Sequence, residues 1–155
     1  MDAKQKATVL ALATALAIPA EGLRQKFYYD PPGILTVCYG HTGDVLKDKT
    51  YTLDECKALL NKDMLNAISA VDSCRPGLPT PVLAAFSDAV YNIGPRIACD
   101  TLNSTAARML RDRDFLGACN QLPRWNQARL AGTMVGLPGL TKRREAERQL
   151  CLTGI

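Results

Sequence analysis

Apolar residues recur every three or four positions between residues 53 and 71, a spacing that predicts a long amphipathic helix. The apolar set is Leu53, Cys56, Leu59, Leu60, Met64, Ala67, Ile68 and Val71. Thr52 and Glu55 form a capping box, in which the side chain of each residue can bind the backbone N–H of the other. The helix is therefore expected to begin directly after Thr52.

A second helical pattern follows a proline-rich loop. Thr80 and Pro81 fit the N-cap and first position of a helix, and Gly94-Pro95 fits its end. The apolar face of this helix would carry Leu83, Phe86, Val90 and Ile93. Shorter helices are expected at residues 101–110 and 114–122, followed by a glycine-rich loop at 132–139 and a charged final helix at 141–150.

Residues 27–45 have a different composition, rich in Tyr, Val, Thr and Gly, which predicts strands. Pro31, Pro32 and Gly33 are typical of a turn between two strands. The order of elements, strands first and helices afterwards, predicts an α+β domain.

The stretch at residues 7–20 is uncharged and alanine-rich, and it follows two lysines, Lys4 and Lys6. It is shorter than the ~20 apolar residues that a stable membrane-spanning helix needs. Three interpretations stay open. The stretch could be a signal peptide cleaved near Ala15-Leu16-Ala17, an uncleaved segment that enters the membrane poorly and can leave it, or the first helix of the domain. The last two are compatible with each other.

Composition limits the class of protein. The chain has 155 residues, 47% of them hydrophobic and 22% charged, which is the size and balance of one globular domain. A disordered chain and a membrane protein with several spans are excluded by the same values. The net charge of +4 is mildly basic and a weak signature for nucleic-acid binding.

The six cysteines are well separated and include no CxxC motif, and His41 is the single histidine. A zinc or thioredoxin-like site needs close pairs, so no metal site is expected. An even number of spaced cysteines favours three disulfides formed in an oxidising compartment, and the alternative is a set of buried free thiols in a cytosolic protein. The cysteines are Cys38, Cys56, Cys74, Cys99, Cys119 and Cys151.

Two carboxylates are candidates for catalysis, since no nucleophile elbow and no glycine-rich phosphate loop occurs. Glu21 follows the apolar stretch, where aliphatic surroundings would favour the protonated form that a general acid requires. Asp30 lies at a polar turn and would stay ionised. Two carboxyl groups in contrasting environments are the arrangement of a glycosidase, and the alternative is a pair of solvated surface groups.

The residues around this pair resemble the phage-type lysozymes, the muramidase endolysins of tailed bacteriophages. The family pattern is Glu, eight residues, Asp, five residues, Thr, and Glu21, Asp30 and Thr36 reproduce both spacings. The resemblance extends over almost the whole chain through Tyr39-Gly40-His41-Thr42, Leu60 to Asp63, Tyr91-Asn92-Ile93-Gly94, Arg124-Trp125, Pro138-Gly139-Leu140 and Arg143-Arg144.

The resemblance implies a lysozyme-like α+β fold, with a small N-terminal β-sheet region, a mainly helical C-terminal lobe and the active-site cleft between them. It implies that Glu21 is the general acid and that Asp30 and Thr36 hold the attacking water. The bond cleaved would be the β-1,4 linkage between N-acetylmuramic acid and N-acetylglucosamine in peptidoglycan, with inversion of the anomeric configuration. Some phage lytic enzymes that lack this aspartate are transglycosylases, so Asp30 favours hydrolysis.

Other positions take roles from the same resemblance. His41 and Asp63 would form a structural ion pair. Asn92 would contact a sugar, or else would merely end its helix. Trp125 is expected in the core. The basic run at Lys142, Arg143, Arg144 and Arg148 is interleaved with Glu145 and Glu147, which favours a solvated helix face over a site for anionic polymers.

Exported members of this family often carry a signal-arrest-release segment, a weakly hydrophobic helix that holds the enzyme inactive at the inner membrane until a phage holin depolarises it. Residues 1–20 would be this segment or the first helix, and residues 21–155 would be the single catalytic domain. The implied route is transient inner-membrane association through residues 7–20, and then the periplasm. We expect a monomer that needs no cofactor and binds no nucleic acid.

Periplasmic release would also explain the cysteines. Fifteen pairings are possible for six cysteines. The expected pairing joins Cys38 to Cys56, Cys74 to Cys99, and Cys119 to Cys151.

Two other classes of protein remain possible from the sequence. One is a secreted cell-wall-binding module that keeps the lysozyme fold without activity, which the intact Glu21, Asp30 and Thr36 set disfavours. The other is a cationic protein that disrupts membranes through its first and last helices, whose action would survive the loss of Glu21.

Overall fold

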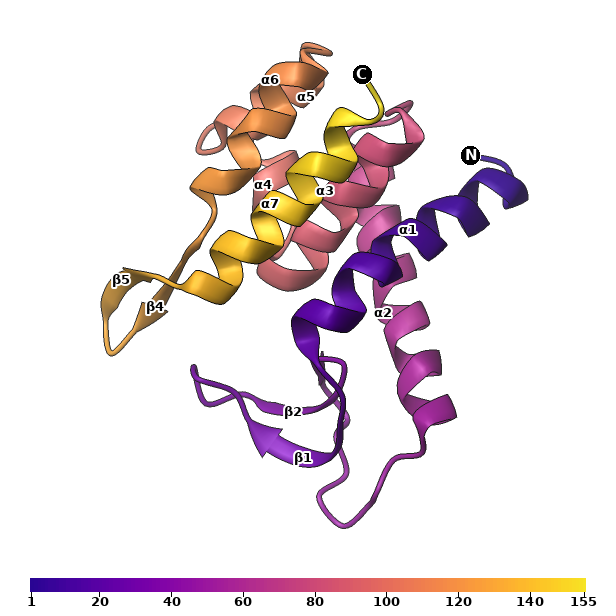
Figure 1. The fold of residues 1–155 in the computed structure, drawn as a ribbon, viewed down its shortest axis with the longest axis vertical. Coiled ribbons are helices and arrows are strands. Elements are labelled where there is room, and N and C mark those ends of the chain that lie inside the picture. Colours follow the sequence, from indigo (N-terminus) through magenta and orange to yellow (C-terminus); the bar gives the residue numbers. More distant parts are fainter.

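The centre of the molecule is a pair of helices, α2 (Leu53–Cys74) and α3 (Thr80–Ile93), in a computed structural model that describes residues 1–155. The predicted capping box starts α2, with both of its hydrogen bonds formed between Thr52 and Glu55. Every residue of α3 from Val82 to Val90 is buried, because α1, α2 and α7 surround it (Figure 1). A helix enclosed on all sides has an apolar residue at nearly every position.

The start of α3 differs by one residue from the prediction. Thr80 is the first helical residue, and Pro79 occupies the N-cap position in an extended conformation (φ −54°, ψ 144°). The fixed φ of proline suits that position, and Pro81, one residue into the helix, lacks an N–H that would otherwise need a partner. Gly94 ends the helix as predicted.

The predicted strand region forms a three-stranded antiparallel sheet in the order β1 (Arg24–Tyr29), β2 (Leu35–Cys38) and β3 (His41–Thr42). The β1–β2 register pairs Tyr28 with Thr36, and a bulge interrupts the ladder between Arg24 and Tyr28. The turn between the strands is at the predicted prolines. It is closed by hydrogen bonds from the Gly33 N–H to the Asp30 carbonyl (2.8 Å) and from the Asp30 N–H to the Ile34 carbonyl (3.0 Å).

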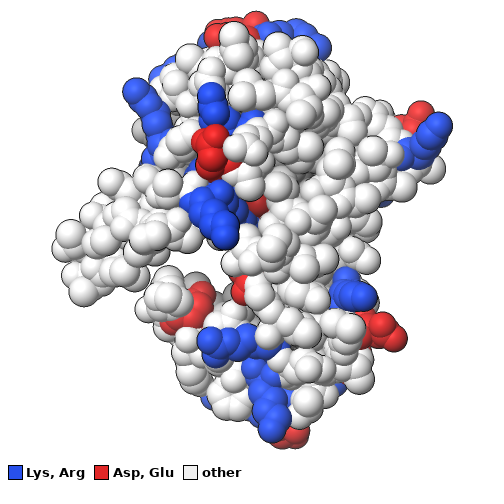
Figure 2. Space-filling model, viewed as in Figure 1, with Lys and Arg blue, Asp and Glu red and all other residues white.

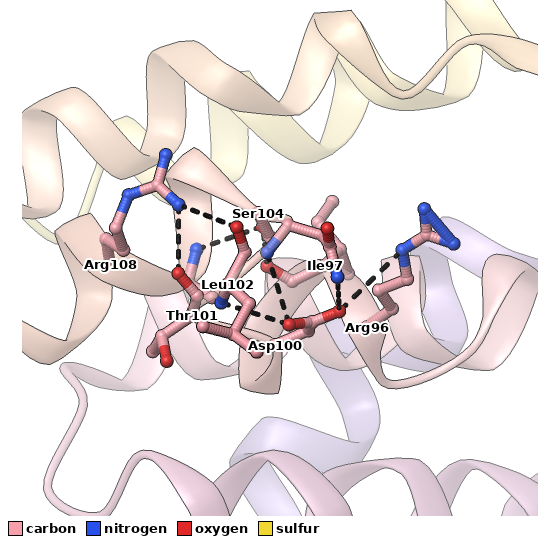
Figure 3. Close-up of polar contacts among 9 residues, drawn as sticks. Arg96, Ile97, Asp100, Thr101, Leu102, Ser104 and Arg108 are labelled. Carbon is pink, nitrogen blue, oxygen red and sulfur yellow. Dashed lines mark hydrogen bonds and ion pairs between the residues drawn. The ribbon is translucent and has the colours of Figure 1, made fainter.

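The helices after α3 are short: α4 (Arg96–Cys99), α5 (Thr105–Arg111), α6 (Phe115–Gln121) and the 3₁₀-helix η1 (Leu122–Arg124). The helix expected at 101–110 begins only at Thr105, because Asp100 holds the preceding residues in a turn. The Asp100 carboxylate accepts the N–H groups of Leu102 (3.0 Å) and Asn103 (3.2 Å), as Figure 3 shows. Ser104 then caps the helix by accepting the N–H of Ala107.

The prediction of a loop at residues 132–139 is wrong, because β4 (Gln127–Leu130) and β5 (Thr133–Gly136) form a hairpin there. Ala131 (φ 50°) and Gly132 (φ 82°) make its two-residue turn. Two successive residues at positive φ are the geometry that suits a tight hairpin, although alanine adopts it with strain. The hairpin projects away from the helices ahead of the last helix, α7 (Pro138–Leu152) (Figure 1).

Residues 7–20 lie within α1 (Ala3–Glu21), which packs against α2, α3 and α7. Its fully buried residues are small and four positions apart, namely Val9, Ala13 and Ala17. Small side chains at this spacing let the helix lie close to α3. No helix in the structure has both the length and the apolar character needed to cross a membrane.

Three disulfides connect these elements, and their pairing is the one expected. Cys38–Cys56 joins the sheet to α2, Cys74–Cys99 joins α2 to α4, and Cys119–Cys151 joins α6 to α7. Each bridge therefore links two elements that are separate in the chain.

The prediction that the charged residues of α7 face solvent is wrong for Arg143, Arg144 and Glu147. The side chains of Arg144 and Glu147 are fully buried, and Arg143 is 4% exposed. Arg144 Nε donates to Glu147 Oε1 at 2.5 Å. Burial raises the pKa of Glu147 to about 8 and outweighs the opposing effect of the nearby guanidinium. Basic and acidic residues that alternate along a helix can therefore pair with each other in the interior as well as face solvent.

Removal of the Cys119–Cys151 bridge should cost about 3–4 kcal/mol of unfolding free energy. It spans 32 residues, the longest separation of the three, so it restricts the unfolded chain most. A double Cys119→Ala, Cys151→Ala variant would be unfolded in guanidinium chloride beside a Cys38→Ala, Cys56→Ala variant, whose bridge spans 18 residues. An unchanged midpoint in the first variant would contradict this expectation.

Glu147 should make stability depend on pH. Its pKa is about 8 in the folded protein and 4.5 for an ordinary exposed glutamate, so between these values the folded state keeps a proton that the unfolded state releases. Stability from this group therefore falls as pH rises from about 4.5 to about 8. Thermal unfolding of Glu147→Gln should be less pH-dependent in this range, whereas Glu145→Gln, a change at a half-exposed carboxylate on the same helix, should keep the wild-type slope.

Candidate active site

Glu21 is the last residue of α1, and its side chain is 18% exposed. One of its oxygens, Oε1, accepts a hydrogen bond from Arg143 Nη1 on α7 at 2.5 Å. The negative end of the α1 dipole also lies at this residue and opposes a negative charge there. Arg143 therefore favours the negative charge of Glu21, the candidate acid, whereas the dipole of α1 opposes that charge.

Arg143 is itself held by a buried carboxylate. Its Nε and Nη2 atoms donate to the two oxygens of Asp88 on α3, at 3.0 and 2.7 Å. The Asp88 side chain is fully buried. Burial opposes the charge of Arg143, but the hydrogen bonds and charges of Asp88 and Glu21 together raise its pKa above the ordinary arginine value.

Asp30 and Thr36 are brought together by one residue of the β1–β2 turn. Asp30 Oδ1 accepts the N–H of Ile34 at 2.7 Å, and the Thr36 hydroxyl donates to the Ile34 carbonyl at 2.8 Å. Thr36 is buried, whereas Asp30 is partly exposed. The bonded hydroxyl of Thr36 keeps its lone pairs free to accept a hydrogen bond from water.

Tyr28 lies opposite Thr36 in the sheet, and the sequence analysis did not identify it as part of the site. Burial, the charge of Glu21 and the charge of Asp30 all raise the pKa of its phenol, whereas Arg24 opposes them. Its register opposite Thr36 places the two side chains on one face of the sheet, so the β alternation was the available signal.

Gly40 makes room for Glu21. It has φ 75°, and a Cβ at this position would stand 2.6 Å from Glu21 Oε2 and 2.9 Å from its carboxyl carbon. Real Cβ atoms do not approach other atoms this closely. The site therefore needs glycine here both for the backbone conformation and for the space.

His41 and Asp63 form the expected ion pair, with 2.5 Å between Nδ1 and Oδ2. Asp63 also lines a cavity of about 320 Å³ beside Gly40, together with Thr42, Asn66, Val90 and Tyr91. Tyr91 donates from its hydroxyl to the Tyr39 carbonyl. Burial and the charges of Glu21 and Asp63 raise its pKa, so its phenol stays neutral.

Asn92 is not among the residues that line this cavity. Its side-chain oxygen is buried and has no hydrogen-bond partner. Its proposed sugar contact therefore has no support from this geometry. Trp125 is partly buried and packs against the core, as expected.

The surface of the molecule is hollowed on the face shown in Figure 2. Figure 2 shows a hollow between the projecting β4–β5 hairpin and the lobe of the sheet, with basic atoms on its helical side and acidic atoms on its sheet side. No group of three or more His, Cys, Asp or Glu side chains is placed to hold a metal ion. The chemistry that these residues offer is carboxylate chemistry, with one acid held by an arginine and one carboxylate next to a hydroxyl.

Comparisons with known proteins agree over most of the chain. A sequence model described as phage lysozyme matches residues 19–147. A SAR-endolysin of bacteriophage PS119 is 44% identical over 136 residues, which are 86% of this chain and 77% of that protein.

Two solved structures of one phage enzyme resemble the chain to different degrees. The active form of the P1 phage endolysin Lyz superimposes with a TM-score of 0.78 at 28% identity, over 92% of this chain and 84% of that one. Its secreted inactive form has a TM-score of 0.53 at 26% identity, over 72% of this chain and 76% of that one. The conformation described here is therefore closer to the active form.

A Gly40→Ala substitution should destabilise the protein more than Gly33→Ala. Both glycines have positive φ (75° and 89°), but a Cβ at position 33 meets no atom within 4 Å. At both positions, placing alanine at positive φ should cost about 1–2 kcal/mol of unfolding free energy. Any further loss at position 40 would measure the collision of the new Cβ with Glu21. Adding Glu21→Ala to each variant provides the check, since only the Gly40→Ala variant should regain stability. Equal losses at the two glycines would contradict the close approach.

Proposed function

The chain belongs to the phage lysozyme family and is a peptidoglycan-hydrolysing endolysin, and from that premise we propose that it cleaves the β-1,4 bond between N-acetylmuramic acid and N-acetylglucosamine. Glu21 is the general acid, and Asp30 and Thr36 hold and activate water. The observation that carries the proposal is the pair of differently held carboxylates, with Glu21 on Arg143 and Asp30 on the Ile34 backbone beside the Thr36 hydroxyl.

In the proposed reaction, the protonated carboxyl of Glu21 gives its proton to the glycosidic oxygen as the bond from that oxygen to C1 of N-acetylmuramic acid breaks. Asp30 takes a proton from the water that Thr36 positions, and the water oxygen bonds to C1 from the opposite face. The anomeric configuration is inverted, which requires roughly 6.5–9.5 Å between the two carboxyl groups. Asp30 then releases its proton and Glu21 is protonated again by solvent.

We also propose that residues 7–20 serve as a signal-arrest-release segment. The enzyme would be held at the inner membrane through this segment, inactive, until a holin depolarises the membrane, and would then act in the periplasm. Two features of the structure support this route. Residues 7–20 are uncharged and end directly before Glu21, and three disulfides fit an oxidising compartment.

Glu21→Gln should remove hydrolysis while leaving the fold intact, because the amide cannot donate the proton. We expect about a 10²–10⁴-fold loss in the rate at which new reducing ends appear from purified peptidoglycan. The control is Glu145→Gln, the same chemical change at a half-exposed α7 carboxylate that binds Arg148. NMR of the first-formed product anomer would test inversion.

Lysis that persists in the Glu21→Gln variant would favour the membrane-disrupting alternative. A wild type that binds peptidoglycan without forming reducing ends would favour the binding module. Retention of the anomeric configuration would contradict the role given to Asp30 and Thr36.

A further inference from the structure

Arg143 presents the proposed mechanism with a difficulty. A general acid must hold its proton until it reaches the substrate, but a guanidinium at hydrogen-bond distance stabilises the ionised carboxylate. The 2.5 Å contact with Glu21 is in a poorly hydrated place, since the Arg143 side chain is 4% exposed.

We propose that Asp88 is a positioning residue for the acid, which balances the charge of Arg143 and fixes its orientation toward Glu21. This inference rests on the proposed function. Asp88 takes two of the guanidinium nitrogens, at 2.7 and 3.0 Å, and leaves Nη1 for Glu21. The two-point contact fixes the plane of the guanidinium and therefore the direction of its third bond.

The charges support this division of roles. Asp88 and Arg143 together carry no net charge, so Glu21 faces a neutral pair through a hydrogen bond. No other carboxylate contacts Arg143. The other ionisable groups around the cluster are Tyr28, Tyr91, Asp30, Asp63 and Glu147, together with the cations Arg24 and Arg144. The two phenols and Glu147 have raised pKa values, so they add little charge at neutral pH.

The position of Asp88 in the fold is otherwise costly. It is fully buried in the middle of α3, within the run of buried residues from Val82 to Val90. A buried carboxylate destabilises the fold strongly unless a partner compensates its charge. An acidic residue at this place is explained by its contact with Arg143, and through Arg143 it reaches the catalytic carboxyl.

The test is the pH profile of reducing-end formation by Asp88→Asn. Asparagine keeps one acceptor for Arg143 but removes the negative charge, so the unshared guanidinium would favour ionised Glu21. We expect the high-pH limb of kcat to move down by about one pH unit, with roughly a tenfold loss at neutral pH and little change in KM. The matched control is Ser87→Ala, a change at the adjacent buried residue, whose hydroxyl has no hydrogen-bond partner. It should keep the wild-type profile.

A double Asp88→Asn, Arg143→Gln variant separates charge balance from structural support. Without the guanidinium, the high-pH limb of the kcat profile should return to the pH of the wild-type limb or to a higher pH. The value of kcat should stay reduced, because Arg143 no longer orients Glu21. This variant contains no buried charge at either site, so it also decides the matter if Asp88→Asn fails to fold.

Two results would overturn the proposal: a folded Asp88→Asn variant whose profile has the wild-type shape, or a double variant whose high-pH limb lies below that of the wild type. Failure of the proposed function has a different signature, because wild type would then form no reducing ends or Glu21→Gln would remain active.

Discussion

The fold depends on a buried guanidinium that needs two carboxylates from two other helices. Arg143 lies on α7, Asp88 on α3 and Glu21 at the end of α1, so one side chain joins three helices. A charge in the interior is tolerated only with partners in good geometry. The ion cluster therefore fixes where α1 ends relative to α7, and that position is also the position of Glu21. In the proposed mechanism, stability and catalysis share the same three groups.

The first helix packs in the protein through small residues. Val9, Ala13 and Ala17 allow α1 to pack closely on α3 without large apolar side chains. The polar groups of the ion cluster lie only at the C-terminal end of α1. Seating of α1 in the protein is therefore completed where Glu21 meets Arg143.

Sequence patterns predicted the local structure better than the distant contacts. The capping box of α2, the glycine that ends α3, and the close spacing of Glu21, Asp30 and Thr36 all lie within short segments where propensity and motif carry the information. The β4–β5 hairpin was missed because its Ala131–Gly132 turn uses an alanine where asparagine or aspartate is usual. The burial of Arg143, Arg144 and Glu147 was missed because charge alternation on a helix looks the same in both environments. Arg143 and Glu21 are 122 residues apart, and no local pattern reports a contact of that kind.

The two halves of the site also differ in how much chain each requires. Asp30 and Thr36 are held by Ile34, so a single hairpin of the N-terminal region supplies the half that is proposed to hold water. The acid half requires α7, which begins at Pro138 and is the last element of the chain. A polypeptide still emerging from the ribosome lacks that helix until residues 138–152 have been made. The order of the elements along the chain thus makes Glu21 wait for a partner that is synthesised 122 residues later.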